Sequence, residues 1–96
     1  MTKSICYIDV SGTKYWYLNG IQHRDDGPAI EYPDGSKFWY KNGKCHREDG
    51  PAIELVDESI CGSKSWYLND EFIGNSKPDN WDELVMLAQV EQVMND

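Results

Sequence analysis

Two short clusters in the sequence hold the side chains that acid–base chemistry and anion binding use. They read His23-Arg24-Asp25-Asp26 and His46-Arg47-Glu48-Asp49. A histidine beside a carboxylate can act as a general base, and arginine is suited to binding phosphate. However, a catalytic group is needed once, whereas this cluster occurs twice in the same context. We therefore favour a structural role, in which His and Arg donate to turn carbonyls or to the Asp side chain, with ligand binding and catalysis as the alternatives. The residues given this turn role are His23, Arg24, Asp26, Gly27, His46, Arg47, Asp49 and Gly50.

Other chemistry finds little support in the sequence. Cys6, Cys45 and Cys61 lack the paired spacing of a zinc site, so we expect no bound metal and no cofactor. No glycine-rich phosphate loop is present, and no Ser/His/Asp set can be assembled, so no catalytic residue is assigned. An odd number of unpaired cysteines favours a reducing, cytoplasmic setting.

The two clusters belong to a longer repeated string. Residues 12–29 read GTKYWYLNGIQHRDDGPA, and residues 35–52 read GSKFWYKNGKCHREDGPA, 23 positions later. A third, partial copy (GSKSWYLND) begins at Gly62, after an insertion of four residues. A fixed period in this range indicates supersecondary units that stack on one another.

Each copy has the composition of β-hairpins. Aromatic runs favour pleated sheet, and Asn19-Gly20 and Asn42-Gly43 are typical of type I′ hairpin turns, with Asn69-Asp70 in the third copy. The Asp-Gly-Pro strings mark a second turn. These signals predict a mainly β protein, an antiparallel meander of roughly eight short strands. The expected strands cover residues 4–10, 14–18, 21–23, 29–32, 37–41, 44–46, 52–56, 64–68 and 71–73.

A helix is expected after the repeats, over residues 80–94. Asn80 is a plausible N-cap, with Glu83 three positions later. Apolar residues recur at helical spacing and give a broad apolar face: Trp81, Leu84, Val85, Leu87, Ala88, Val90, Val93 and Met94. Because an open sheet edge invites aggregation, we expect this helix to pack on the sheet as its cap.

Length and charge limit the number of domains and the kinds of partner that the chain can bind. The 96 residues form one domain, 1–96, with a net charge of −8. Residues 62–96 carry most of the excess acid. This balance disfavours direct nucleic-acid binding and anionic membranes, and permits a protein partner with a basic surface. No apolar run is long enough for a membrane span, and the first residues lack the features of a signal peptide.

The repeated unit Gly-x-Lys-x-Trp-Tyr-x-Asn-Gly-x-x-His-Arg-x-Asp-Gly-Pro-Ala-Ile-Glu resembles the MORN-repeat family, most closely the variant in YwqK-like, phage and giant-virus proteins. The resemblance covers residues 5–73 and implies two and a half β-hairpin repeats in an elongated, twisted antiparallel sheet. It also implies a binding or scaffolding module without a catalytic constellation. Two full copies are too few for a long scaffold, and the C-terminal helix is not part of the repeat. In size and charge the chain also resembles small phage proteins that disable bacterial defences.

The aromatic residues indicate where a partner would bind. Trp16, Trp39 and Trp66 form one column on the sheet, and Tyr15/Tyr17, Phe38/Tyr40 and Tyr67 point to the opposite face. One helix cannot cover both faces, so we expect at least one aromatic row to be accessible. The leading hypothesis is a non-enzymatic protein–protein interaction protein, in its sharper form a small acidic phage-encoded inhibitor of a host defence protein that binds nucleic acid. The alternative is a sponge that binds a small anionic ligand or nucleotide. The expected partner-binding residues are Tyr17, Trp39, Tyr40, Asp70, Glu71, Asp79, Asp82 and Glu83.

Overall fold

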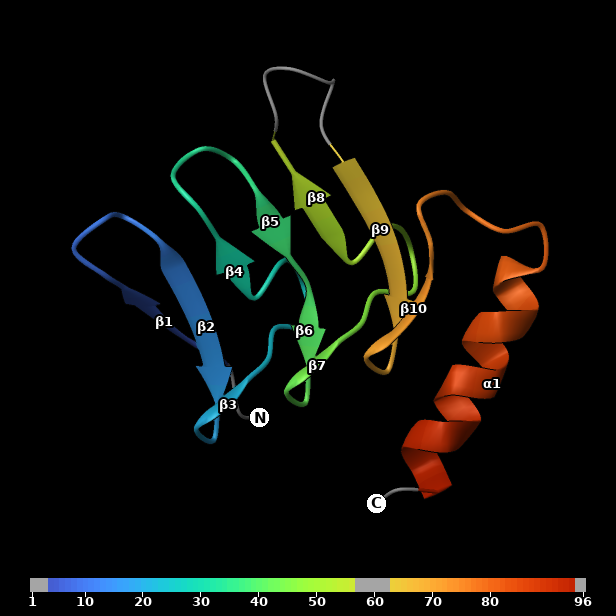
Figure 1. Ribbon diagram of the computed structural model, residues 1–96. Helices are drawn as coiled ribbons and strands as arrows, with labels where there is room; N and C mark the ends of the chain where they lie inside the picture. The colour runs from blue at the N-terminus through green and yellow to red at the C-terminus, as the bar shows by residue number, and fades with distance from the viewer. Residues whose placement is uncertain (1–3, 57–62, 95–96) are drawn as a thin grey trace.

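The structure is a computed structural model that describes residues 4–56 and 63–94, the last three by their backbone alone. The predicted loop 57–61, with Cys61, lies outside the described residues. Ten strands and one helix follow in chain order (Figure 1): β1 (Ile5–Ile8), β2 (Lys14–Leu18), β3 (Ile21–Gln22), β4 (Ile30–Glu31), β5 (Lys37–Phe38), β6 (Tyr40–Lys41), β7 (Lys44–Cys45), β8 (Ile53–Leu55), β9 (Ser63–Leu68), β10 (Glu71–Gly74) and α1 (Trp81–Met94).

The strands form an antiparallel meander. The main sheet has the order β1-β2-β4-β5-β8-β9-β10, with β3 paired to the end of β2. Strands β6 and β7 make a hairpin of their own, beyond the end of β5. The predicted fold class, mainly β with one C-terminal helix, is therefore confirmed. Most strands end within one or two residues of their expected positions.

The clearest departure is the predicted strand 37–41, which is divided at Trp39 into β5 and β6. The Trp39 amide donates to the carbonyl oxygen of Ala52 in the main sheet (2.7 Å), while its carbonyl accepts from the amide of His46 (3.1 Å). The backbone therefore leaves one sheet and enters the small hairpin at this residue. Trp16 makes the same two kinds of bond, with Ala29 and His23, within an unbroken β2.

The hairpin turns have the backbone that their sequences predict. Both turn residues lie at positive φ, as a type I′ turn requires. The values are 54° and 77° at Asn19-Gly20, 55° and 79° at Asn42-Gly43, and 51° and 71° at Asn69-Asp70. The third turn thus holds an aspartate in a conformation that glycine adopts more easily.

The cross-strand register gives the main sheet two different faces. Charged residues of alternating sign stand opposite one another across five strands, in the order Lys14, Glu31, Lys37, Glu54 and Lys64. Trp16 and Trp66 share this face, because they lie two residues along their strands; we call it the Trp face. The neighbouring row points the other way and is uncharged; we call this side the Tyr face. Its row runs across six strands through Tyr7, Tyr15, Ile30, Phe38, Ile53 and Ser65.

Helix α1 lies beside β10, at the last edge of the sheet (Figure 1). Leu68, Trp81 and Ala88 form its buried contact. Half-buried residues pack around them: Trp66, Ile73, Leu84 and Val85. Because Trp66 and Leu68 belong to the Trp face, α1 caps the sheet on that side only. The predicted position of the helix is confirmed.

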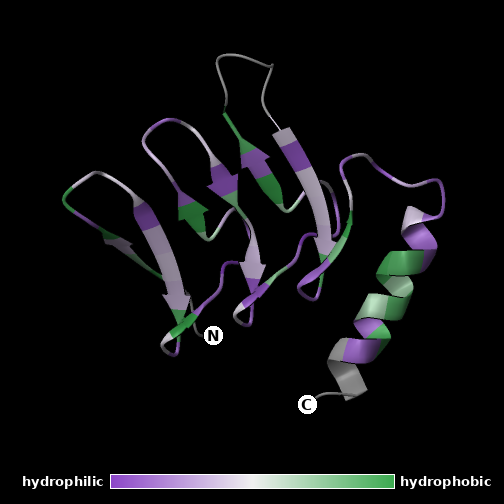
Figure 2. Ribbon diagram, viewed as in Figure 1, coloured by the Kyte–Doolittle hydropathy of each residue, from purple (hydrophilic) through white to green (hydrophobic). Residues whose placement is uncertain are grey.

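The apolar face of α1 is broader than its contact with the sheet. Hydrophobic residues recur along the helix (Figure 2), but Met86, Leu87 and Val90 are exposed. The described part of the chain contains no helix with the length and hydrophobicity of a membrane span.

Candidate functional site

The two His-Arg clusters build a repeated stack of side chains on the Trp face. The guanidinium carbon of Arg24 lies 3.9 Å from the ring centre of Trp16, and that of Arg47 lies 3.8 Å from the ring centre of Trp39. A guanidinium over an indole face is held by a cation–π attraction. The side chain of Arg24 also donates to the carboxylate of Asp26 (3.1 Å).

Backbone acceptors and a second carboxylate complete each stack. Arg47 donates to the Asp49 carboxylate (2.9 Å), to the carbonyl oxygen of Pro51 (3.0 Å) and to Glu54 (2.9 Å). Arg24 makes the corresponding contacts with the Pro28 carbonyl and with Glu31. The turn carbonyls and the Asp side chains are thus the partners of both guanidinium groups. Both guanidinium groups already have partners within the fold, so they are poorly placed to bind a phosphate.

The glycine of each Asp-Gly-Pro turn has no Cβ atom, and the guanidinium occupies the space that a Cβ would need. A Cβ atom on Gly27 would lie 2.8 Å from the guanidinium carbon of Arg24, and one on Gly50 would lie 2.9 Å from that of Arg47. Real Cβ contacts are not this short, so with any larger residue the guanidinium would have to shift from its position over the tryptophan.

Each histidine of the clusters joins its own copy to the next one. The Nδ1 atom of His23 accepts the backbone N–H of Asn42 (2.9 Å), and Nδ1 of His46 accepts that of Asn69 (3.0 Å). Because Nδ1 is an acceptor, the ring proton sits on Nε2, which donates to Asp25 from His23 and to Glu48 from His46, at 2.9 Å each. Both histidines are buried, and both nitrogens of each ring are engaged. The geometry therefore supports a positioning role in the sheet.

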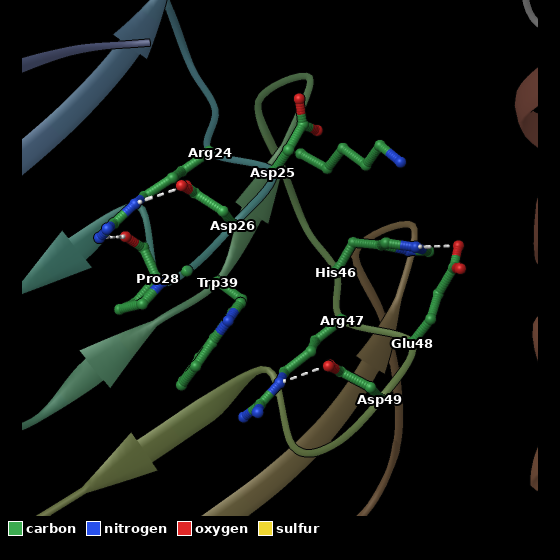
Figure 3. A pocket seen from close by; sticks show the side chains of 11 residues that line it. Arg24, Asp25, Asp26, Pro28, Trp39, His46, Arg47, Glu48 and Asp49 are labelled. Carbon is green, nitrogen blue, oxygen red and sulfur yellow. Dashed lines mark hydrogen bonds and ion pairs between the residues drawn. The ribbon is translucent and has the colours of Figure 1, made fainter. Parts of the chain in front are cut away.

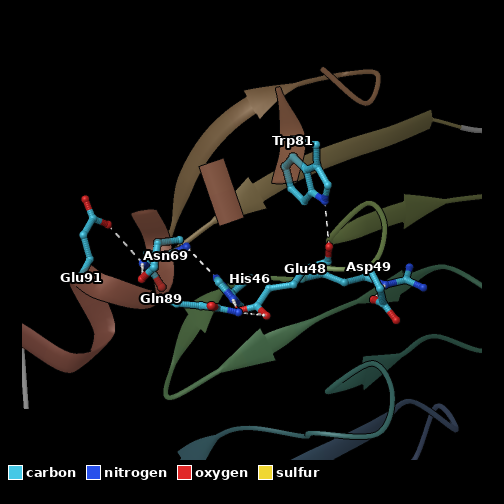
Figure 4. A network of polar contacts seen from close by, with 9 residues as sticks. His46, Glu48, Asp49, Asn69, Trp81, Gln89 and Glu91 are labelled. Atoms are coloured by element: carbon cyan, nitrogen blue, oxygen red, sulfur yellow. Dashed lines mark hydrogen bonds and ion pairs between the residues drawn. The ribbon is translucent and has the colours of Figure 1, made fainter. Parts of the chain in front are cut away.

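Glu48 is the point where the second cluster holds the helix (Figure 4). Its carbonyl oxygen accepts the indole N–H of Trp81 (2.8 Å), and its carboxylate accepts from Gln89 (3.0 Å) and from His46. Burial opposes ionisation of this carboxyl, but the hydrogen bonds from His46 and Gln89 outweigh it and hold the pKa of Glu48 below its ordinary value. The matching residue of the first copy, Asp25, remains exposed.

The third copy closes the row differently. Gly74 stands opposite Trp66, at the position where the arginine stands in the other copies. With no guanidinium available, Trp66 packs against the cluster of α1 that contains Trp81 and Leu68. The helix thus takes the place of the third arginine.

Two hollows lie along the turns. The first, of about 620 Å³, lies between the turn at 24–28 and the segment from Trp39 to Asp49 (Figure 3). The second, of about 440 Å³, lies between the turn at 48–51 and the start of α1, and its lining includes Trp66, Lys77 and Asp82. They are neighbours, since Glu48 and Asp49 line both.

A row of five carboxylates lines the two hollows, alongside four cationic side chains. We call this row the turn-edge acidic surface; it consists of Asp25, Asp26, Glu48, Asp49 and Asp82. The side chains of Asp26 and Asp49 are 88% and 87% exposed, although each accepts a hydrogen bond from an arginine. Lys41 and Lys77 also line the hollows, and the surface keeps an excess of negative charge because both arginines are paired with further carboxylates.

The predicted partner-binding residues do not form one surface. Tyr17 lies on the Tyr face, opposite Ile5 and Gln22, whereas Trp39 carries Arg47 on its ring. Tyr40 lies in the separate β6–β7 hairpin, paired with Cys45.

The predicted acidic residues are divided as well. Asp70 and Glu71 lie at the β9–β10 turn, and the Asp70 carboxylate accepts the amide of Cys45 (2.7 Å). The exposed residues Asp79, Asp82 and Glu83 lie at the start of α1, at the other end of the helix from its contact with Asn69. Of these acids, Asp82 joins the turn-edge acidic surface. Asp26 and Asp49 were predicted only as turn residues, although an acidic pair after each His-Arg was the signal for this surface.

Neither cysteine among the described residues is placed for chemistry. Cys6 is exposed, and Cys45 is buried. Burial and the nearby Asp70 carboxylate raise the pKa of the Cys45 thiol to about 12, so it stays protonated and unreactive at neutral pH. Within residues 4–56 and 63–94, no group of three His, Cys, Asp or Glu side chains is arranged to hold a metal ion.

Comparisons of the chain with protein-family models, with curated proteins and with solved structures found no match.

Proposed function

We propose that this chain is a non-enzymatic protein-binding protein that docks a basic surface of its partner on the turn-edge acidic surface. The observation that carries the proposal is the joining of two hollows at Glu48 and Asp49, with exposed carboxylates along both rims. Recessed surfaces with several carboxylates suit lysine and arginine side chains of a partner, and the negative potential speeds their encounter.

The fold keeps this acidic surface in a fixed shape. The stacked arginines hold Asp26 and Asp49, the helix holds Glu48, and Asp82 is fixed in the first turn of α1. A surface already held in its binding shape loses little conformational entropy when a partner docks.

The same charges argue against the nucleotide sponge. An anionic ligand entering the first hollow would meet Asp25, Asp26 and Asp49, while Arg24 and Arg47 are already paired with carboxylates. Releasing a guanidinium for a phosphate would leave Glu31 or Glu54 without its partner. A basic protein partner needs no such exchange.

The finer form of the proposal is an inhibitor, encoded by a phage, that covers the nucleic-acid-binding surface of a host protein. Such surfaces are basic because they contact phosphates. The turn-edge acidic surface offers carboxylates in a row along two successive turns, which supports a partner of that kind.

The test compares two single charge reversals, one beside the second hollow at the start of α1 and one at the β9–β10 turn. The wild type, Asp82→Lys and the matched control Glu71→Lys are immobilised and exposed to bacterial lysate at low and high salt. Glu71 is an exposed acid at the β9–β10 turn, away from both hollows. The proposal expects one protein that the wild type and Glu71→Lys retain at low salt, and that Asp82→Lys or high salt releases.

Two outcomes count against the proposal. One is retention of the same partner by Asp82→Lys at the wild-type level. The other is bound material that absorbs at 260 nm without protein, which would favour the sponge. Far-UV circular dichroism and a thermal melt establish that both variants remain folded.

A further inference from the structure

Among the described residues, no helix or second sheet packs on the apolar Tyr face of this single-layer sheet. Helix α1 and the stacked arginines lie on the Trp face, where they cover Trp66, Trp16 and Trp39. On the other side, Tyr7, Leu55 and Phe72 are exposed, whereas Ile30 at the centre of the row is buried by its neighbours and the rest of the row apart from Tyr7 is half-buried. A sheet with an apolar face ordinarily buries that face against another layer.

The molecule is flat, so the Tyr face is broad for its mass. A compact protein of this mass (11.1 kDa) exposes about 5,700 Å². This chain exposes 6572 Å² and measures 39 × 39 × 17 Å. A standard interface takes roughly 800 Å² from each partner, and a broad sheet face suits that requirement.

The charge pattern selects a second copy of this chain as that layer. Among the paired positions of the main sheet, every Lys and Glu lies on the Trp face, and the Tyr face has none. The carboxylate next to this row is that of Asp9, just after β1, and it already accepts the Tyr15 hydroxyl (3.3 Å) and the amides of Ser11 and Thr13, so it offers little to a basic partner. In a two-fold dimer each patch meets itself, so an uncharged patch is suited to self-association even in a chain of net charge −8.

The side-chain volumes fit the same arrangement. Along the uncharged row the large residues Tyr7 and Tyr15 stand at one end, and Ile53 and Ser65 at the other. A two-fold axis that runs parallel to the strands, between β4 and β5, lays the row of one copy against the row of the other copy in the opposite order. Each large side chain then faces a small one: Tyr7 with Ser65, Tyr15 with Ile53, and Phe38 with Ile30.

We propose that two copies of the chain pack Tyr face to Tyr face about such an axis and form a β-sandwich. Sheets packed in this way lie about 10 Å apart, with interdigitated side chains. The two turn-edge acidic surfaces stay outside the interface. The dimer is independent of the proposed partner binding, so failure of one leaves the other standing.

The experiment measures the mass of the full-length protein in solution, by light scattering and sedimentation equilibrium, from low to high micromolar concentration. The proposal expects twice the chain mass of 11.1 kDa. Tyr7→Glu should raise the dimer dissociation constant by about tenfold or more, because it buries a carboxylate. The matched control is Ile8→Glu, on the other face of the same strand and similarly exposed (57% against 60%). It should leave the dimer intact.

A pair of opposite charges tests the register. Ser65→Lys alone should weaken the dimer, and Tyr7→Glu combined with Ser65→Lys should restore it. Within one chain these two positions are five strands apart, about 24 Å, so the restored attraction acts between copies. A monomer at all concentrations, equal weakening by Ile8→Glu, or no restoration in the combined variant would each overturn the proposal.

Discussion

Adding a single methyl group at Gly50 should destabilise the protein. The φ angle of Gly50 is not in the positive region that disfavours alanine. At such positions Gly→Ala usually stabilises a protein by about 0.4–1 kcal/mol, because it restricts the unfolded chain. Here the added Cβ would lie 2.9 Å from the guanidinium carbon of Arg47. The guanidinium must therefore shift, which weakens its contact with Trp39 and its hydrogen bonds.

The expected loss can be worked out from the contacts of Arg47. The cation–π contact contributes about 0.5–2 kcal/mol, and the hydrogen bond to the Pro51 carbonyl about 1 kcal/mol. The ion pairs with Asp49 and Glu54 add between about 0 and 1 kcal/mol each, because they are partly solvated. These contacts sum to about 1.5–5 kcal/mol, so after the unfolded-state gain of about 0.4–1 kcal/mol is subtracted, their complete loss in Gly50→Ala should cost about 0.5–4.6 kcal/mol. For a domain of this size, each kcal/mol lowers the melting temperature by roughly 4–8 °C.

The assay is a double-mutant cycle in urea and thermal unfolding, followed by circular dichroism and tryptophan fluorescence. In an Arg47→Ala background the methyl group meets no guanidinium, so Gly50→Ala should become neutral or stabilising. The same destabilisation in both backgrounds would refute the reasoning, because the cost would then lie in the backbone. Gly27→Ala, whose Cβ would lie 2.8 Å from the guanidinium carbon of Arg24, repeats the test in the first copy.

Three further predictions follow from single contacts. Ionised Glu48 stabilises the fold above its ordinary pKa of 4.5, and this contribution disappears as pH falls through its lowered folded-state pKa. The difference in the free energy of unfolding between wild type and Glu48→Gln, measured in urea, should therefore shrink from pH 7 to pH 3. An unchanged difference would contradict this. In a Cys61→Ser protein at pH 8, iodoacetamide should modify exposed Cys6 and spare Cys45, as mass spectrometry of native and urea-unfolded samples will show; equal rates in the native state would count against it. Asp70→Ala should cost about 1 kcal/mol more in urea unfolding than Asp70→Gly, because both lose the bond to Cys45 and only alanine is strained at φ 71°; equal costs would show that the turn carries no such strain.

The sequence was most informative where local chemistry decides the structure. The Asn-Gly turns follow from the residues that tolerate positive φ, and the apolar spacing after Asn80 predicted α1. The break at Trp39 could not be predicted in this way. Trp16 makes the same two kinds of backbone bond within the unbroken strand β2, so neither the residue composition nor this bonding pattern indicates which copy has the divided strand.

The candidate site was partly hidden for a similar reason. The repeated acidic pairs were visible, but their place on one surface with Asp82 depends on the hollow beside α1. The stacking of Arg47 on Trp39 also joins residues of different strands. Helical periodicity showed which residues of α1 are apolar, but not that Leu87 would face solvent, because the width of the contact is set by the sheet.

The hydrogen bond from each histidine to the next turn has a consequence for chain length. His23 reaches Asn42 across 19 residues, and His46 reaches Asn69 across 23. The two bonds are 2.9 and 3.0 Å long, so the four residues gained between Val56 and Ser63 left the docking of the next hairpin unchanged. The hydrogen bond from the histidine therefore sets the position of the next hairpin, and the length of the connection before that hairpin does not. Connections of different length can therefore precede the same docked hairpin, since added residues cost little closure entropy.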